Sequence, residues 1–171
     1  MPIKVGDRLP SAKLFEFIEE EKEGCSIGPN PIDLTTEIAG KTVVIFAVPG
    51  AFTPTCSAKH LPGFVEHYEA LIAQGIDEVW CLSVNDAFVM GMWGMLSGVG
   101  KKVRMIADGS AQLTQKLGVG LDLIDRGMGI RSQRYSMLVK NGIVELFNLE
   151  SPGAFEVSSA QTMLKQLGTK S

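Results

Sequence analysis

The sequence predicts an α/β fold built on a mixed β-sheet with helices on its faces. In the first part of the chain, strand-like apolar runs alternate with segments of helical spacing. One run, residues 42–48, is apolar and β-branched, which is typical of a strand buried on both faces. Farther on, Asn141-Gly142 separates two apolar runs and is a strong signal for a β-hairpin. These patterns alone do not distinguish a thioredoxin-like from a flavodoxin-like strand order.

Length and composition favour a single domain, residues 1–171. The net charge of −3 argues against a nucleic-acid partner, because phosphate binding needs clustered Lys and Arg. No apolar run approaches the roughly 20 residues that cross a bilayer, so no membrane span is expected. The N-terminal segment has no apolar signal region, and we expect a cytoplasmic location. The three cysteines include no Cys-x-x-Cys pair, and with two histidines no metal site is expected. No cofactor is expected either.

The first quarter of the chain predicts short elements. Residues 5–17 alternate loosely and favour one or two strands. The charge run at 19–23 is better explained as a solvated face than as a partner-binding patch. Gly, Pro and Asn predict a loop over 24–31, with an exposed Cys25. A short helix over 33–38 should end at Gly40.

The rest of the chain predicts further strands and helices in alternation. The expected elements are a helix over 57–74, strands over 78–84 and 103–107, helices over 87–96 and 110–117, a loop over 118–129, strands over 134–140 and 143–148, and a final helix. Asp86 should cap the helix over 87–96, and Ser158 with Gln161 should form a capping box for the final helix. Cys81 lies in the middle of a strand, where a buried structural thiol is the favoured interpretation.

The stretch between the strand over 42–48 and the helix that follows carries the chemistry. Pro49 and Gly50 mark a sharp turn, Thr53 stands at an N-cap position, and Pro54 follows at the first helical position. Cys56 therefore falls in the first helical turn. Free backbone N–H groups and the helix dipole favour a thiolate there. A thiolate is the nucleophilic form of cysteine, so we interpret Cys56 as a reactive thiol rather than a structural one.

These residues carry a resemblance to a known family. Residues 49–57, Pro-Gly-Ala-Phe-Thr-Pro-Thr-Cys-Ser, resemble the peroxidatic-cysteine motif of peroxiredoxins. The continuation through residues 60–64, His-Leu-Pro-Gly-Phe, resembles the type II subfamily, also called the peroxiredoxin five group. The stretches 81–88, 107–109 and 131–136 agree with it. The resemblance implies a thioredoxin-like fold, with a central mixed sheet flanked by helices, and a thiol-dependent peroxidase of hydrogen peroxide and alkyl hydroperoxides.

A peroxidase of this kind needs a thiolate and donors that stabilise the leaving oxygen. Cys56 is the expected nucleophile, the Thr53 hydroxyl and the backbone N–H groups of the Thr55-Cys56 turn would hold the peroxide, and Pro49 would shield the thiolate from water. A guanidinium would polarise the peroxide. From the residues alone, two arginines could supply it. The resemblance assigns this role to Arg134 and leaves Arg131 as a supporting residue.

The expected product, a sulfenic acid on Cys56, must be reduced by a second thiol. Animal-type members of the subfamily carry a resolving cysteine in the segment equivalent to residues 156–159, and this chain has none there. Plant-type members have a cysteine where Cys81 stands, so Cys81 is a possible resolver if its strand opens. The resemblance favours an external thiol, with glutathione and glutaredoxin ahead of thioredoxin.

The resemblance also implies a homodimer that associates through faces around the active site. Phe52, Phe88 and the edge at residues 75–77 are candidate contacts, and Phe52, Phe88 and Leu121 could line a pocket for an alkyl peroxide.

Two other functions are compatible with the sequence. A cysteine hydrolase could pair Cys56 with His60, because the two share a helix face at a spacing of four residues. Such enzymes usually bring the histidine from a distant segment, so a hydrogen-bonded His60 that holds local structure is the favoured interpretation. A peroxide-sensing protein without efficient turnover is the second alternative.

Overall fold

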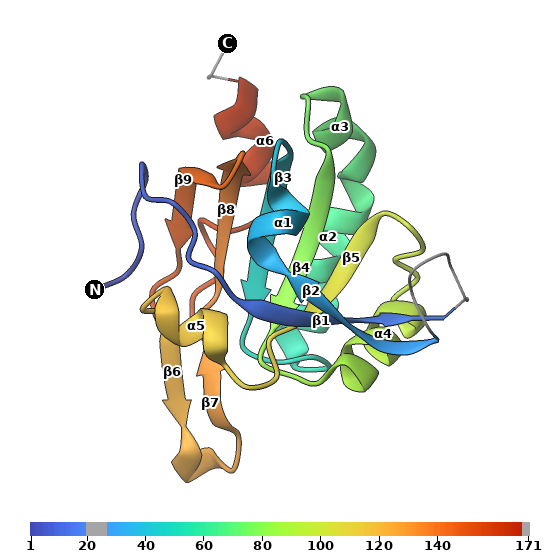
Figure 1. The fold of residues 1–171 in the computed structure, drawn as a ribbon, viewed down its shortest axis with the longest axis vertical. Helices are drawn as coiled ribbons and strands as arrows, with labels where there is room; N and C mark the ends of the chain where they lie inside the picture. The colour runs from blue at the N-terminus through green and yellow to red at the C-terminus, as the bar shows by residue number, and fades with distance from the viewer. Residues whose placement is uncertain (20–26, 169–171) are drawn as a thin grey trace.

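A computed structural model describes residues 1–19 and 27–168 of the chain. Its centre is a seven-stranded mixed sheet in the order β2-β1-β5-β4-β3-β8-β9 (Figure 1). Strands β3, β4 and β5 run parallel to their neighbours in this group, whereas β1 and β8 join it antiparallel. The strands are β1 (Lys13–Ile18), β2 (Gly28–Asp33), β3 (Thr42–Val48), β4 (Glu78–Ser83), β5 (Val103–Ala107), β8 (Tyr135–Lys140) and β9 (Ile143–Leu149). The predicted mixed α/β sheet is confirmed.

The central strands are buried on both faces because helices cover each side of the sheet. Along β3, Val44 and Phe46 join one apolar cluster, while Val43 and Ile45 join the other. The first cluster also receives residues from α2 (Leu61–Glu66), α3 (Tyr68–Ala73), α4 (Ala87–Leu96) and α6 (Ala160–Gly168). The second receives residues from α1 (Leu34–Ile38) and α5 (Gln112–Lys116).

Several predicted boundaries agree with the structure. The strands at 42–48 and 103–107 and the helix at 87–96 match β3, β5 and α4 residue for residue, and the Asp86 side chain accepts a hydrogen bond from the Val89 N–H. Within the described ranges, no helix has the length and apolar content that crossing a membrane requires.

The loop predicted over 24–31 is partly wrong. Gly28–Asp33 forms β2, which pairs with β1 alone at the edge of the sheet. Two prolines made this segment look like a loop, but an edge strand tolerates proline where its missing N–H would face away from the ladder. Residues 20–26, which hold Cys25 and most of the charge run, lie outside the described residues.

The loop predicted over 118–129 is also wrong. The segment contains β6 (Gly120–Leu123) and ends where β7 (Gly129–Ser132) begins, and the two strands pair antiparallel as a separate two-stranded sheet. A short 3-10 turn, η2 (Ile124–Arg126), connects them, and the hairpin extends from one end of the main sheet (Figure 1). The sequence prediction missed this hairpin because each strand is only four residues long and begins with Gly, and Gly and Asp are typical of loops.

The predicted cap of the last helix is displaced by one residue. Ser159 accepts a hydrogen bond from the Thr162 N–H through its hydroxyl at 3.1 Å. Ser158, the predicted cap, instead donates its own N–H and hydroxyl to the Glu150 carboxylate. The sequence could not reveal this partner because Glu150 lies at the end of a different element.

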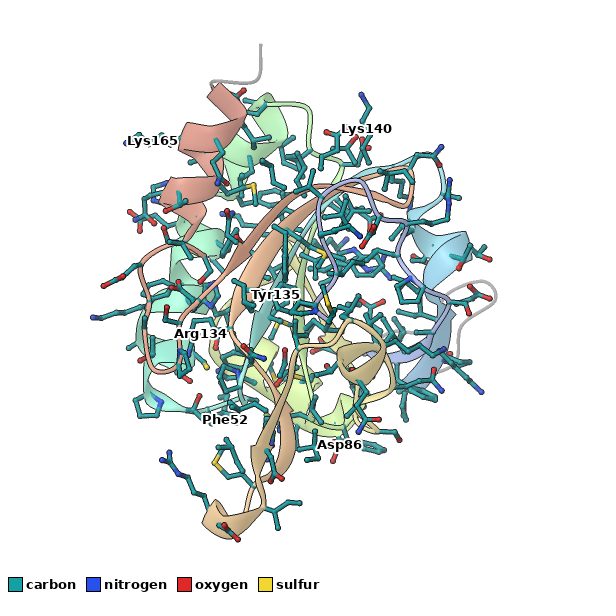
Figure 2. The ribbon with its side chains drawn as sticks, turned by 90° about the vertical axis from the view of Figure 1, so that its left-hand side faces the viewer. Phe52, Asp86, Arg134, Tyr135, Lys140 and Lys165 are labelled. Atoms are coloured by element: carbon teal, nitrogen blue, oxygen red, sulfur yellow. The ribbon has the colours of Figure 1, made fainter. Side chains whose placement is uncertain are left out.

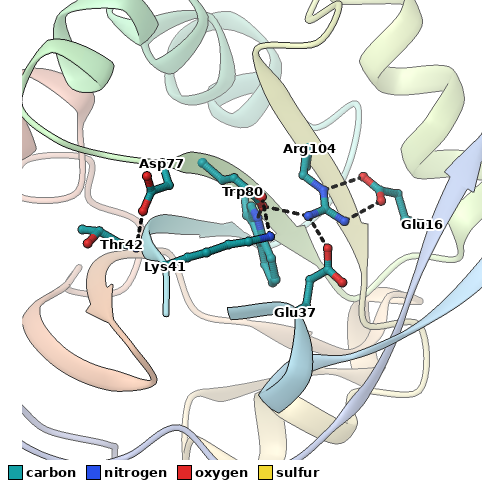
Figure 3. Close-up of polar contacts among 8 residues, drawn as sticks. Glu16, Glu37, Lys41, Thr42, Asp77, Trp80 and Arg104 are labelled. Carbon is teal, nitrogen blue, oxygen red and sulfur yellow. Dashed lines mark hydrogen bonds and ion pairs between the residues drawn. The ribbon is translucent and has the colours of Figure 1, made fainter. Parts of the chain in front are cut away.

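A charged cluster fastens four elements together on one side of the sheet (Figure 3). Arg104 on β5 forms ion pairs of 2.7–2.8 Å with Glu16 on β1, Glu37 on α1 and Glu78 on β4. Lys41 adds a 2.8 Å ion pair to Glu78. The Arg104 guanidinium also lies 5.2 Å from the ring centre of Trp80. The Arg104 side chain is only 24% exposed. Its loss would leave the three carboxylates close together with one remaining cation, Lys41.

Candidate active site

The turn that leads from β3 to Cys56 is fixed by hydrogen bonds. The Thr53 hydroxyl donates to the Gly50 carbonyl at 2.7 Å, and the Ala51 N–H donates to the Asn85 side chain at 2.9 Å. Phe52 has a φ of 65°, in the left-handed region. Thr53 precedes the helix, as predicted, but its hydroxyl bonds backward into the turn.

Cys56 lies in the first turn of the following helix, and its side chain is fully buried. Residues Cys56–His60 form a π-helical turn, η1, in which the Leu61 N–H donates to the Cys56 carbonyl. A continuous α-helix over 57–74 was therefore the wrong prediction: η1, α2 and α3 follow one another, with a break at His67. Apolar spacing does not distinguish a single π-turn from an α-helical one. Such turns frequently occur at functional sites.

Arg134 reaches Cys56 from a segment far along the chain. Its Nη2 donates to the Cys56 sulfur at 3.1 Å. The sheet explains this approach, since β8 runs antiparallel to β3 and Tyr135 pairs with Ala47. The start of β8 therefore meets the end of β3, where the Cys56 turn begins (Figure 2). A guanidinium at hydrogen-bonding distance stabilises a thiolate by its charge.

His60 holds the other side of the Arg134 guanidinium. Arg134 Nη1 lies 2.9 Å from His60 Nδ1, and His60 Nε2 lies 2.9 Å from the Ser158 carbonyl oxygen. Since Arg134 can only donate, Nδ1 accepts and Nε2 carries the proton. Burial first, and the nearby charge of Arg134 second, lower the pKa of His60 to about 3. The imidazole is thus neutral, and both of its nitrogens are occupied.

This geometry argues against a Cys–His hydrolase. A general base needs a free nitrogen lone pair directed at the nucleophile. The Nδ1 lone pair of His60 accepts from Arg134, and Nε2 holds its proton against a carbonyl. His60 is a hydrogen-bonded residue of the helix, which is the interpretation the sequence favoured.

A third group of contacts supports His60, and sequence reasoning missed it. The Glu150 carboxylate accepts hydrogen bonds from the backbone N–H groups of Glu156, Val157 and Ser158. Burial opposes ionisation of Glu150, but these bonds and one from the Ser158 hydroxyl hold its pKa below the usual range. The segment that presents the Ser158 carbonyl to His60 is therefore anchored. No pattern in the sequence pairs residue 150 with 158, so only the folded chain reveals the connection.

Cys81 lies on β4, buried completely and in the same apolar cluster as Cys56. Burial raises the pKa of Cys81 well above the usual range, and the charge at Cys56 adds to this effect. Cys81 is therefore a neutral thiol inside the sheet. It can attack a sulfenic acid only after its strand opens.

Arg131 lies beside the turn and does not contact the sulfur. Its Nε donates to the Met128 carbonyl at 2.8 Å, and its Nη1 donates to the Pro49 carbonyl at 3.4 Å. Pro49, Thr53 and Thr55 lie in the turn and helix start that lead to Cys56, and Arg131 bonds to this turn. Arg134 is the arginine in contact with the thiol. Among the described residues, no group of three His, Cys, Asp or Glu side chains is arranged to hold a metal ion.

Comparison with known proteins decides the family. The redoxin family model matches residues 4–164 of this chain. Peroxiredoxin-2C of Arabidopsis thaliana is 47% identical over 166 residues, covering 97% of this chain and 99% of its own length. The chain belongs to the peroxiredoxins, within the redoxin family. The resemblance to type II members agrees with a second relative, chloroplastic Peroxiredoxin-2E-2 of rice, which is 49% identical over 96% of this chain and 72% of that protein.

Solved structures confirm the thioredoxin-like fold of this peroxiredoxin. Reduced Prx3 from Vibrio vulnificus, in complex with hydrogen peroxide, has a TM-score of 0.89 at 45% identity, covering 96% of this chain and 99% of that one. A chain from Burkholderia cenocepacia has a TM-score of 0.95 at 58% identity, covering 96% and 98%. This peroxiredoxin is an oxidoreductase that reduces peroxide with thiols.

Proposed function

We propose that this peroxiredoxin reduces hydrogen peroxide and alkyl hydroperoxides through a sulfenic acid on Cys56, and that glutathione with glutaredoxin regenerates the thiol. The observation that carries the proposal is the 3.1 Å hydrogen bond from Arg134 Nη2 to the Cys56 sulfur. It pairs a cysteine in a helical first turn with a permanent positive charge.

In the first step, the Cys56 thiolate attacks one peroxide oxygen, and the O–O bond breaks. A sulfenic acid forms, and the other oxygen leaves as alkoxide or hydroxide and takes up a proton to give an alcohol or water. Negative charge therefore grows on the leaving oxygen. Arg134 and the free N–H groups of the first helical turn are the donors that stabilise it. The Thr53 hydroxyl donates its hydrogen bond to the Gly50 carbonyl, so its oxygen can accept a hydrogen bond from the peroxide.

In the second step, one glutathione displaces water from the sulfenic acid and forms a mixed disulfide with Cys56. The glutaredoxin thiol then takes the glutathione from Cys56 as a new mixed disulfide, and Cys56 leaves as its thiolate. A second glutathione attacks that disulfide, which frees glutaredoxin and yields oxidised glutathione. Burial of Cys81 supports an external reductant, since its neutral thiol is held inside β4. Thioredoxin remains the competing reductant. A cytoplasmic location stays a prediction, and two relatives are named chloroplastic.

We also propose a homodimer that buries the apolar surface around the active site. Phe52 and Phe88 are 51% and 61% exposed, and Met92, Met95 and Leu96 continue this surface along α4. Exposed apolar side chains gathered in this way are typical of association surfaces. A Phe88→Asp variant should shift the sedimentation coefficient from dimer to monomer, while a sedimenting monomer in the wild type would contradict the proposal.

The test of the enzymatic proposal is peroxide consumption with glutathione plus glutaredoxin, beside a thioredoxin system. We expect turnover with the first donor and its loss in Cys56→Ser. Turnover retained by Cys56→Ser would exclude this mechanism. No turnover with either donor, in a protein whose Cys56 still oxidises stoichiometrically, would favour the peroxide-sensing alternative.

A further inference from the structure

Arg131 joins the β6–β7 hairpin to the turn before Cys56. It lies on β7, where its Nε donates to the Met128 carbonyl within the hairpin at 2.8 Å. Its Nη1 reaches across to the Pro49 carbonyl at 3.4 Å. The guanidinium therefore spans from the hairpin to the active-site turn.

Gly50 makes this approach possible. A Cβ atom on Gly50 would lie 2.8 Å from Arg131 Nη1 and 3.1 Å from Thr53 Cγ2. The absent side chain thus leaves one small space that both the guanidinium and Thr53 border. Because Thr53 stands at the expected peroxide position, Arg131 lies at the side of the same site.

Arg131 forms no ion pair with any residue of 1–19 or 27–168, where the ion pairs of arginine all belong to Arg104. Its side chain is nevertheless half-buried. Both partners of Arg131 are neutral carbonyls. A guanidinium has five N–H donors, and these two bonds leave the remainder available. A carboxylate is the group that best matches such a fork of donors.

An apolar side chain accompanies this cation. Leu121 pairs directly with Arg131 across the hairpin, so both side chains project from the same face. Leu121 is itself half-buried. The hairpin therefore presents a cation and an aliphatic group side by side, next to the turn that carries the reactive thiol.

We propose that Arg131 binds the carboxylate of an organic molecule that approaches Cys56, with Leu121 contacting its aliphatic portion. The inference rests on the proposed function, because that function supplies the two candidate ligands. Two molecules that enter such a site can carry a carboxylate: the reducing thiol, as in glutathione, and an organic hydroperoxide with an acid group. Both present the same chemistry to Arg131, and the experiment separates them.

The test is equilibrium binding, followed by NMR titration of the reduced wild-type protein. S-methylglutathione and its diethyl ester represent the thiol, and hydroxyhexanoate and its methyl ester represent the hydroperoxide. We expect at least one acid to bind about tenfold or more tightly than its ester, as for a charge-assisted hydrogen bond. Arg131→Met should abolish that preference, and Arg131→Lys should retain part of it. Arg126→Met is the matched control, because it removes an exposed arginine from the same hairpin and should leave the preference unchanged.

Equal affinities of acid and ester in both pairs, or an acid preference that survives Arg131→Met, would overturn the inference. Consumption of tert-butyl hydroperoxide, which has no carboxylate, is measured on the same samples. Its absence in the wild type would refute the proposed function while an Arg131-dependent acid preference still supported the carboxylate site. The two failures are therefore distinguishable.

Discussion

The neutral, buried His60 should make the free energy of unfolding of this peroxiredoxin depend on pH, and His60→Gln should remove this dependence. In the folded chain the pKa of His60 is about 3, because burial and the charge of Arg134 disfavour the imidazolium. In the unfolded chain it returns to about 6.5. Between these values the unfolded state binds the extra proton, so the free energy of unfolding falls as the pH falls through this window.

The size of the effect follows from the two pKa values. Lowering the pH from about 7.5 to about 5.5 should reduce the free energy of unfolding by about 1.4 kcal/mol through His60 alone. Most carboxylates in the unfolded chain stay ionised across this range, since they titrate near pH 4. The window therefore isolates the histidine contribution.

The assay is urea unfolding followed by tryptophan fluorescence at both pH values. We would use the Cys56→Ser background so that oxidation of the reactive thiol does not change the protein during the titration. His60→Gln should lose the pH-dependent difference and should be less stable at the higher pH, because Arg134 and the Ser158 carbonyl lose their partners. His67→Gln removes the only other histidine of the chain and should keep the difference. If His60→Gln retained the wild-type difference, the reasoning about a neutral, doubly bonded imidazole would be refuted.

Three further variants test other parts of the structure. Arg134→Ala should slow oxidation of Cys56 by about 100-fold or more in stopped-flow measurements, as expected for loss of a donor to a developing oxyanion; an unchanged rate would transfer the role to Arg131 or to backbone donors. Cys81→Ala should leave glutaredoxin-supported turnover within about twofold of wild type, since the chemistry does not use a buried neutral thiol; lost turnover would make Cys81 the resolving thiol. Arg104→Met should lower the free energy of unfolding by about 2 kcal/mol in urea titrations, which is less than the loss expected from breaking a fully buried ion pair. A change below about 0.5 kcal/mol would show that the cluster is not stabilising.

Local patterns were sufficient for the elements that carry strong periodicity or clear capping residues. β3 was predicted to the residue because a short β-branched apolar run is typical of a strand that is buried on both faces. Asp86 predicted the start of α4 because an aspartate at the N-cap accepts a hydrogen bond from an N–H group of the first helical turn. The β6–β7 hairpin was not predicted because four-residue strands that begin with Gly resemble loop sequence. The edge strand β2 was not predicted because it contains proline, which edge strands can hold.

The sequence by itself determined the turn that places Cys56, the proposed nucleophile, among backbone N–H groups of a first helical turn. The order Pro49, Gly50, Thr53, Pro54 and Cys56 encodes a strand end, a turn and a helix start within eight consecutive residues, and such local geometry follows from local chemistry. The family resemblance then identified the arginine, which the residues alone did not separate from its neighbour.

Only the tertiary structure decided how these groups cooperate. Antiparallel pairing of β8 with β3 places Arg134 at the sulfur, and the π-turn after Cys56 places His60 against Arg134. The segment anchored by Glu150 then supplies the carbonyl that fixes the proton of His60 on Nε2. The hydrogen bonds of Arg134 to Cys56 and His60, and of His60 to Ser158, join segments more than 70 residues apart, whereas the π-turn depends on a single helical hydrogen bond. Periodicity and propensity describe neighbours along the chain, whereas these contacts arise from the way the sheet brings distant strand ends together.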